Sequence, residues 1–279
     1  MKQHRLREGD VIALDTKTQL TTAGSDTAPG PLMVPAGMKF ITAVTVSAIQ
    51  NMAAATGFSG FIRLEGPGMK NSTESVAVVA GGNNVATGGN GVSKATRISL
   101  NLPVNEASEI QVFAEMAGTD IGGMGVVVGL EFSDTAGEGE AEMRTLTLEG
   151  DITAVDSRTA LTAQGSVATP SLLVPAGYTK IIKIIVACAS NGLADGKQSF
   201  FLRLGGNAVQ GGEQLLPISA AGRIAVQAGS DSAPQICTPV ILDNVDIPVS
   251  SSDSVSVWAE GAGDDTGTAY VVATLVFGK

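Results

Sequence analysis

The chain of 279 residues contains a single histidine, His4, close to its start. Ser-His-Asp and Cys-His nucleophile systems need an imidazole beside the nucleophile, so the body of the chain cannot build either one. The usual zinc, copper and non-haem iron sites also rely on histidine ligands and are excluded for the same reason. We therefore predict a protein that is not an enzyme and needs no metal or other cofactor.

Cysteine and positive charge are also scarce. The two cysteines, Cys188 and Cys237, both lie in the second half of the chain, which excludes a disulfide framework shared by the two halves. We expect Cys188 to be a small buried side chain. Seventeen Lys and Arg against 27 Asp and Glu give a net charge of −10, so the body of the chain has no basic nucleic-acid footprint.

Long hydrophobic runs are missing as well. No apolar segment approaches the ~18 residues of a membrane-spanning helix, and the polar start of the chain has no hydrophobic stretch of signal-peptide length. We therefore expect a protein made without an export signal. The 35 glycines, with only 4 % aromatic residues, suit the short turns and small core side chains of an all-β protein.

The most informative feature present is an internal repeat. The matching segments are Glu8–Asp10 with Glu149–Asp151 (149 − 8 = 141), Val34–Gly37 with Val174–Gly177 (174 − 34 = 140), Phe61–Leu64 with Phe201–Leu204 (201 − 61 = 140), and Phe132 with Phe277 (277 − 132 = 145). The matches keep their order, and the offset changes only where loops would differ in length. One domain has therefore been duplicated in tandem.

Each copy consists of short segments rich in Val, Ile, Phe and Thr, separated by turn residues. About eight such segments in ~130 residues predict an all-β protein of two tandem jelly-roll β-sandwiches. We predict an N-terminal arm at 1–7, jelly roll 1 at 8–132, a polar linker at 133–144 and jelly roll 2 at 145–279. The repeated Val-Pro-Ala-Gly segment is predicted to be a structural turn.

Strand alternation assigns a face to each duplicated residue. One row of the long strand is apolar in both copies and is predicted to be core: Val44, Val46 and Ala48, with Ile184, Val186 and Cys188. Two other strands place an aromatic residue beside a charge on the opposite, less apolar face. These interface candidates are Phe61, Arg63, Phe113 and Glu115 in the first copy and Phe201, Arg203, Trp258 and Glu260 in the second.

We predict that Arg63 pairs with Glu115 and Arg203 with Glu260, with the aromatic rings packed alongside. The alternative is that each charge is solvated on its own. Because exposed pairs contribute only ~0–1 kcal/mol, the pairing matters mainly if an interface covers it.

Other polar motifs have simpler explanations. The duplicated carboxylates Asp10/Asp151, Asp15/Asp156 and Glu115/Glu260 fit turn or edge positions better than a catalytic pair. Asp120 and Asp264-Asp265 could bind calcium or form Asp/Gly turns. The glycine-rich segment 81–91 lacks the ending of a phosphate loop. The basic residues of the arm at 1–7 either touch nucleic acid weakly or form a solvated tail.

Taken with the repeat, the paired Leu-Met-Val-Pro-Ala-Gly (32–37) and Leu-Leu-Val-Pro-Ala-Gly (172–177) turns, the paired Phe-x-Arg-Leu strands and the closing strands at Phe132 and Phe277 resemble the double jelly-roll major capsid proteins of icosahedral viruses. The resemblance implies a virion protein made in the host cytoplasm. It also implies homotrimers with a pseudo-sixfold outline that tile a shell, contacts with other capsid proteins, and weak contact of the N-terminal arm with nucleic acid or an inner membrane. It implies no small-molecule substrate.

The competing interpretation is a tandem β-sandwich that binds carbohydrate or a cell surface. Such modules need exposed aromatic rings for stacking on sugars, and this chain has one Trp and two Tyr. Trimers, shells or tubes in solution would favour the capsid interpretation, whereas a monomer that binds glycans would favour the binding module.

Overall fold

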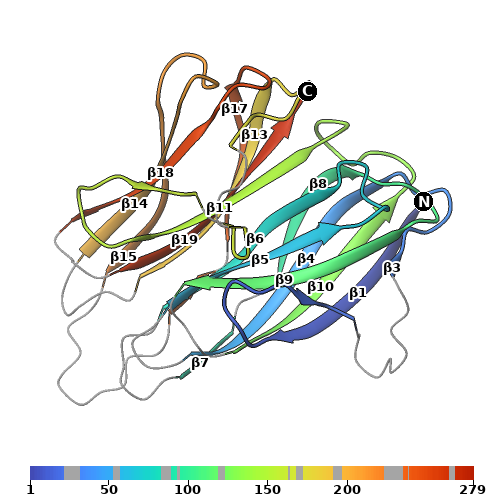
Figure 1. Cartoon of the computed structure of the whole chain (residues 1–279), viewed down its shortest axis with the longest axis horizontal. Coiled ribbons are helices and arrows are strands. Elements are labelled where there is room, and N and C mark those ends of the chain that lie inside the picture. The colour runs from blue at the N-terminus through green and yellow to red at the C-terminus, as the bar shows by residue number, and fades with distance from the viewer. Residues whose placement is uncertain are drawn as a thin grey trace.

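The computed structural model describes residues 1–21, 32–52, 57–82, 89–92, 95–118, 123–162, 164–167, 172–190, 197–222, 235–237, 239–263 and 268–279. Throughout these residues the chain forms strands and turns, without a helix (Figure 1). The first half contains β1 (Lys2–Val11), β2 (Thr18–Gln19), β3 (Leu32–Met33), β4 (Phe40–Met52), β5 (Gly57–Glu65), β6 (Thr73–Gly82), β7 (Gly89–Val92), β8 (Thr96–Pro103), β9 (Glu109–Gly118) and β10 (Gly123–Ser133). The second half contains β11 (Arg144–Ile152), β12 (Thr159–Ala160), β13 (Lys180–Ser190), β14 (Lys197–Gly205), β15 (Gln214–Gly222), β16 (Gln235–Cys237), β17 (Val240–Pro248), β18 (Ser256–Gly263) and β19 (Ala269–Gly278).

Each half is a jelly roll built from two antiparallel sheets. In the first half, the first sheet has the order β1-β10-β4-β8 and the second sheet the order β2-β9-β5-β6. In the second half the corresponding orders are β11-β19-β13-β17 and β12-β18-β14-β15. The two orders are identical once each strand is matched to its duplicate. The predicted fold class, two jelly-roll sandwiches related by duplication, is therefore confirmed.

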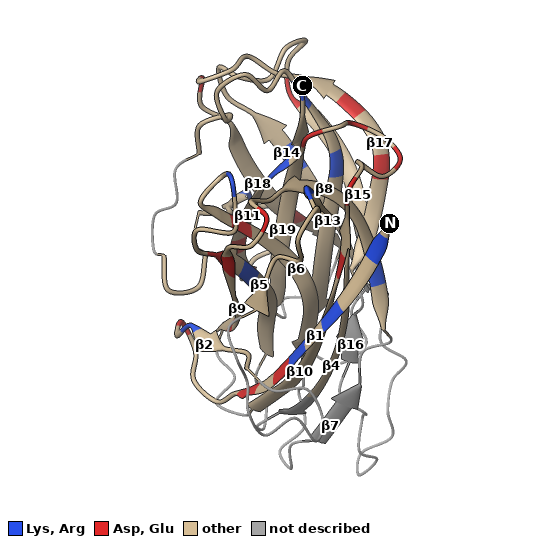
Figure 2. Cartoon of the chain, turned by 90° about the vertical axis from the view of Figure 1, so that its right-hand side faces the viewer, with Lys and Arg blue, Asp and Glu red and all other residues tan. Residues whose placement is uncertain are grey.

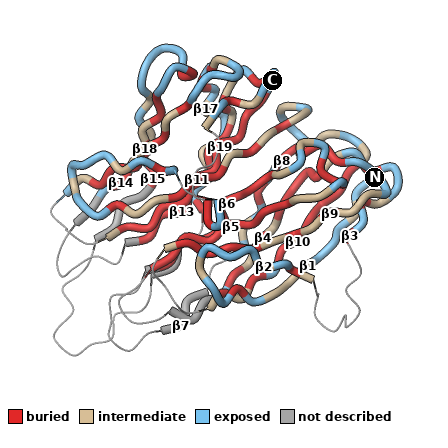
Figure 3. Tube along the Cα trace, in the orientation of Figure 1, coloured by how far each residue is buried: buried red, intermediate tan, exposed pale blue. Residues whose placement is uncertain are grey.

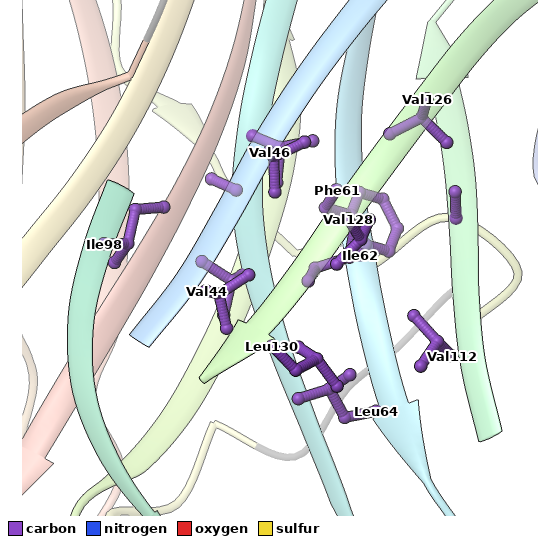
Figure 4. Packing of buried hydrophobic residues seen from close by; sticks show 14 of the residues in the cluster. Val44, Val46, Phe61, Ile62, Leu64, Ile98, Val112, Val126, Val128 and Leu130 are labelled. Carbon is purple, nitrogen blue, oxygen red and sulfur yellow. The ribbon is translucent and has the colours of Figure 1, made fainter. Parts of the chain in front are cut away.

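Each jelly roll has its own apolar core between its two sheets. The predicted core rows are buried: Val44, Val46 and Ala48 in β4, and Ile184, Val186 and Cys188 in β13. Figure 4 shows side chains of β4 and β10 meeting those of β5 and β9 in the first core. Alternation of apolar and polar residues along the strands thus sets the inward face.

The two jelly rolls are joined by a third apolar layer. The outer face of the second jelly roll's first sheet (β11, β19, β13) packs against β5 and β6 of the first jelly roll. Ile185, Ala187, Val272 and Val276 belong to the same cluster as the first core. Figure 3 shows buried residues along β6 and β13, where the two halves meet. The row opposite the core in β13 is therefore buried, because a second domain covers it.

The predicted N-terminal arm is instead part of the first sheet. Residues 2–7 belong to β1, whose partners run antiparallel from Lys2–Ser133 to Val11–Met124. Figure 2 shows Lys and Arg along this edge strand. Charges on an edge strand discourage pairing with another chain, so the basic residues have a structural explanation that the sequence alone did not reveal. Residues 134–143 connect β10 to β11.

The duplicated turns adopt the same backbone conformation in both copies. Gly37 and Gly177 have φ of 79° and 82°, and Met38 and Tyr178 donate backbone hydrogen bonds to Pro35 and Pro175, each at 3.1 Å. A positive φ at this turn position favours glycine, which confirms the structural role predicted for Val-Pro-Ala-Gly. Most of the glycine-rich loop (83–88) and Asp120, Asp264 and Asp265 lie outside the described residues.

Gly57 offers a test of the layer between the jelly rolls. A Cβ at this position would overlap the ring of Tyr270 from β19. We expect Gly57→Ala to lower the free energy of unfolding by about 1–3 kcal/mol through overpacking, measured by urea denaturation. Gly123→Ala in β10 is the control, because its Cβ would meet nothing closer than 3.5 Å. Equal effects of the two substitutions would contradict this packing.

Candidate functional site

The interface candidates form two equivalent faces on the second sheets. On β5 and β9, Phe61 lies opposite Glu115 and Arg63 opposite Phe113. On β14 and β18, Phe201 lies opposite Glu260 and Arg203 opposite Trp258. Each face therefore alternates aromatic and charged side chains across neighbouring strands. We call the face of the first jelly roll the covered face and that of the second jelly roll the open face.

The covered face contains a fully buried ion pair. Arg63 Nε donates to Glu115 Oε1 at 2.8 Å, and the two side chains are 3 % and 0 % exposed. The Phe61 ring is also buried, and its centroid lies 5.7 Å from the Arg63 guanidinium carbon. The predicted pairing is present, with the predicted aromatic beside it.

Residues 164–166 of the second jelly roll close over this pair. Arg63 donates to the backbone carbonyl of Gln164 at 3.0 Å and to its Oε1 at 3.3 Å. The backbone N–H of Ser166 donates to Glu115 Oε2 at 2.8 Å. Gly165, at φ 55°, leaves no room for a Cβ, which would lie 2.6 Å from Phe61. The ionic groups are thus hydrogen-bonded on both sides of the domain boundary, as a buried pair requires.

Threonines of the second jelly roll also bond the edge of β6. The N–H groups of Ser75 and Ala77 donate to Thr145 Oγ1 at 2.9 Å and Thr274 Oγ1 at 2.8 Å. Thr147 Oγ1 donates to the Ser75 carbonyl at 2.8 Å. Because an unpaired sheet edge exposes backbone donors and acceptors, these bonds satisfy the β6 edge at Ser75 and Ala77. Farther along the same edge, β16 of the second half pairs with residues 80–82. Sequence reasoning missed the threonine bonds, since threonine on a strand gives no sign of what it faces.

An acid at the start of β6 completes this contact. Glu74 accepts from the N–H and Oγ1 of Thr145 at 2.6 and 2.8 Å, and its Oε1 lies 2.9 Å from Arg144 Nε. Burial raises the pKa of Glu74 to about 7, although Arg144 and Thr145 oppose the shift. Desolvation of the carboxylate therefore outweighs its partners.

A second carboxyl at the domain boundary also has a raised pKa. Glu149 of β11 accepts one hydrogen bond, from the Gly165 N–H at 3.3 Å. Burial raises its pKa to about 7, and the like charges of Asp15, Asp151 and Glu115 add to the shift. The pKa of Asp151 is also raised, by burial and by Asp15. Ionisation of these groups works against contact between the jelly rolls.

The open face has the same pair in a less buried setting. Arg203 binds Glu260 through Nε at 2.6 Å and NH2 at 3.3 Å, and Glu213 through NH1 at 2.8 Å. The guanidinium carbon of Arg158 lies 5.7 Å from the centre of the Trp258 ring, repeating the placement of Lys17 over Phe113 at 4.7 Å. Both predicted pairs are therefore present, but one is internal and the other faces outward.

A groove of about 690 Å³ is lined by residues of β8, the 134–143 connection, β13 and β17. Its lysines are bonded: Lys183 donates to the Ser99 carbonyl at 2.6 Å and pairs with Asp243 at 3.0 Å, while Lys180 pairs with Glu140. The groove is lined by three basic and four acidic side chains, and Lys183 ties β13 to β8.

The predicted basic arm lies in β1 and also makes ion pairs, among them the Met1 amino group with Asp134 at 2.7 Å. Lys2 binds Glu131 at 2.8 Å, and His4 Nε2 lies 3.9 Å from the same carboxylate. The hydrogen bond from Lys2, with further bonds from Thr42 and Arg97, lowers the pKa of Glu131 to about 2. Within the described ranges, no three His, Cys, Asp or Glu side chains gather as metal ligands. The same residues include no helix long and apolar enough to cross a membrane.

No protein-family model matches the sequence, and no curated protein matches it either. Among solved structures, PNGase F, a glycosylasparaginase from Flavobacterium meningosepticum, matches at 9 % identity and a TM-score of 0.38, covering 98 % of this chain and 96 % of that one. The triple jelly roll of an archaeal virus matches at 10 % and 0.27, covering 98 % and 56 %. Broad bean stain virus matches at 8 % and 0.29, covering 96 % and 90 %. These likenesses establish neither a family nor an activity.

The two ion pairs predict unequal mutational effects. Arg63→Met leaves Glu115 buried without its partner and is expected to cost about 3–5 kcal/mol. Arg203→Met is expected to cost about 1 kcal/mol or less, because Glu260 keeps Arg158 at 3.5 Å and contact with water. Chemical denaturation at low protein concentration measures both. Similar losses would show that the first pair is not covered as described.

The raised pKa values predict that stability falls as pH rises. The folded-state pKa of about 7 in Glu74 and Glu149 lies above the usual 4.5, so their stabilisation is complete below 4.5 and lost as pH rises through about 7. We expect the thermal midpoint to be lower at pH 8 than at pH 5, with a flatter dependence in Glu74→Gln/Glu149→Gln. Glu131→Gln, whose carboxyl has a pKa of about 2, should lower the midpoint without flattening the dependence. A midpoint that rises with pH would contradict the assignment.

Proposed function

We propose that the chain is a structural subunit that assembles with copies of itself, most simply as the major capsid protein of a virus. In this role it forms homotrimers with a pseudo-sixfold outline that tile a shell, and it acts in the virion after synthesis in the host cytoplasm. Its function is then structural rather than enzymatic, with neither cofactor nor small-molecule substrate. Other capsid proteins are further partners, and nucleic acid or an inner membrane would meet the basic edge of β1.

The open face carries this proposal. Its Arg–Glu pair and aromatic residues repeat a constellation that another jelly roll buries in the first half of the chain. Leu215, beside Arg203 on this face, is 56 % exposed. An exposed apolar side chain next to half-buried aromatic and arginine residues has the composition of a protein contact surface. A subunit made of two alike domains can use alike contacts within and between chains.

A carbohydrate-binding module is the second candidate, since Trp258 is half-buried on the face of a β-sandwich. Sugar rings stack on an aromatic face that is free. Arg158 lies over the Trp258 ring and is held there by Glu213 at 3.0 Å. This arrangement favours protein contact over sugar stacking.

Sizing chromatography with light scattering, followed by electron microscopy, tests the proposal. We expect concentration-dependent species of three chains and larger assemblies, and Trp258→Ala should weaken association by about ten-fold or more. Phe113→Ala, at the equivalent position of the covered face, is the matched control and should leave association unchanged. A monomer at all concentrations that binds glycans on an array would overturn the proposal in favour of the binding module.

A further inference from the structure

Inside the chain, the second sheet of the first jelly roll meets the first sheet of the second jelly roll. The duplicates of these two sheets each have an outer face without a partner in the described chain. One is the open face, on the second sheet of the second jelly roll. The other is the outer face of the first sheet of the first jelly roll, which we call the β1 face. Leu6, Ile49 and Val127 on the β1 face are 52 %, 52 % and 41 % exposed. Both faces therefore expose apolar side chains.

The first sign that these two faces fit each other lies at the sheet edge. Inside the chain, the Ala77 N–H donates to the Thr274 hydroxyl. The residue equivalent to Ala77 is Pro217, because Phe61 pairs with Ala77 and Phe201 with Pro217. The residue equivalent to Thr274 is Gly129 (274 − 129 = 145). Pro217 has no N–H and Gly129 has no hydroxyl, so donor and acceptor are lost together.

A neighbouring contact changes in the same way. Inside the chain, the backbone of Ser75 bonds the hydroxyl of Thr147. The residue equivalent to Ser75 is Leu215, because Ser75 pairs with Arg63 and Leu215 pairs with Arg203. The residue equivalent to Thr147 is Leu6, because Thr147 pairs with Thr274 and Leu6 pairs with Gly129. A polar contact has thus become a potential contact between two leucines, both more than half exposed in the single chain.

The ion pair between Glu74 and Arg144, at the start of β6, also has different residues at both equivalent positions. Glu74 and Arg144 correspond to Gln214 (214 − 74 = 140) and Gln3 (144 − 3 = 141). Two opposite charges have been replaced by two neutral amides, each able to donate to and accept from the other. Changing only one side would have left a charge facing an amide in a buried contact, which is costly.

We infer that the open face binds the β1 face of a second copy of the chain, in the relative placement that the two jelly rolls have inside one chain. This inference rests on the proposed self-assembly and names the two surfaces that carry it. The contact is head-to-tail, with different faces on the two copies, so each subunit offers one of each. Leu215 and Pro217 lie against Leu6 and Gly129, and Gln214 faces Gln3.

Cysteine pairing across the contact tests the geometry. With both native cysteines replaced, we make Gly129→Cys and Pro217→Cys as separate proteins, oxidise each alone and then oxidise an equimolar mixture. We expect a two-chain disulfide product only from the mixture. Ile12→Cys, an exposed residue at the end of β1, replaces Gly129→Cys in the control mixture and should give no product.

Three other results of the cross-linking experiment would each contradict a different part of the proposal. Strong cross-linking of either variant with itself would show like faces in contact and overturn the inference. Assembly without the mixed product would overturn the pairing of faces and leave self-assembly standing. A mixture that stays monomeric by light scattering would contradict the proposed function and the inference together.

A charge exchange gives an independent readout. Gln214→Glu puts an unpaired carboxylate into the contact and should raise the concentration for half-assembly by about ten-fold or more. Adding Gln3→Arg rebuilds the Glu74–Arg144 pair between copies and should restore assembly. Gln210→Glu, in the exposed turn before β15, is the control and should change little. Failure of the double variant to recover would overturn the placement of Gln3 opposite Gln214.

Discussion

The outer face of β5 and β9 and the edge of β6 are the constraint on which the rest of the structure depends. The face carries an arginine and a glutamate with almost no exposure to water. The edge carries backbone donors at Ser75 and Ala77 that bond side chains instead of a strand. A single jelly roll with this surface would leave a sheet edge open to any passing strand. Residues 164–166 and the threonines of β11 and β19 form hydrogen bonds with these groups. The second jelly roll therefore stabilises the first.

The same constraint explains why the two copies have diverged where they have. The second jelly roll keeps the arginine, the glutamate and the aromatic residues, yet its β15 edge has Pro217 where β6 has a hydrogen-bonded alanine. Proline on an edge strand prevents pairing by an incoming strand. The open face is thus suited to a contact made by side chains, which is easier to form and break than one completed by backbone bonds.

The sequence allowed the architecture to be predicted because the duplication provides two copies of each strand, whose sequences can be compared. Apolar rows kept in both copies marked the cores, and Arg63 with Glu115 could be paired because both lay on the non-core face of neighbouring strands. The covering of that face by the other half of the same chain could not be predicted. Residues such as Thr147 and Thr274 are compatible with water or with a buried contact, and only the packing of whole sheets decides between them. Strand β1 was missed for a related reason, since the charges of an edge strand resemble those of a solvated tail.

The edge of β6 is covered within a single chain, whereas the edge of β15 is proposed to be covered only when a second copy binds. Amide hydrogen exchange followed over a range of protein concentrations measures both edges in one experiment. The amides to compare are those directed away from the neighbouring strand, which are Ser75 and Ala77 in β6 and Leu215 in β15. The account predicts that the amides of Ser75 and Ala77 are protected at every concentration, while the amide of Leu215 becomes protected only as concentration rises. Exchange at Leu215 that does not depend on concentration, or exchange at Ser75 and Ala77 as fast as at Leu215 in the dilute protein, would contradict it.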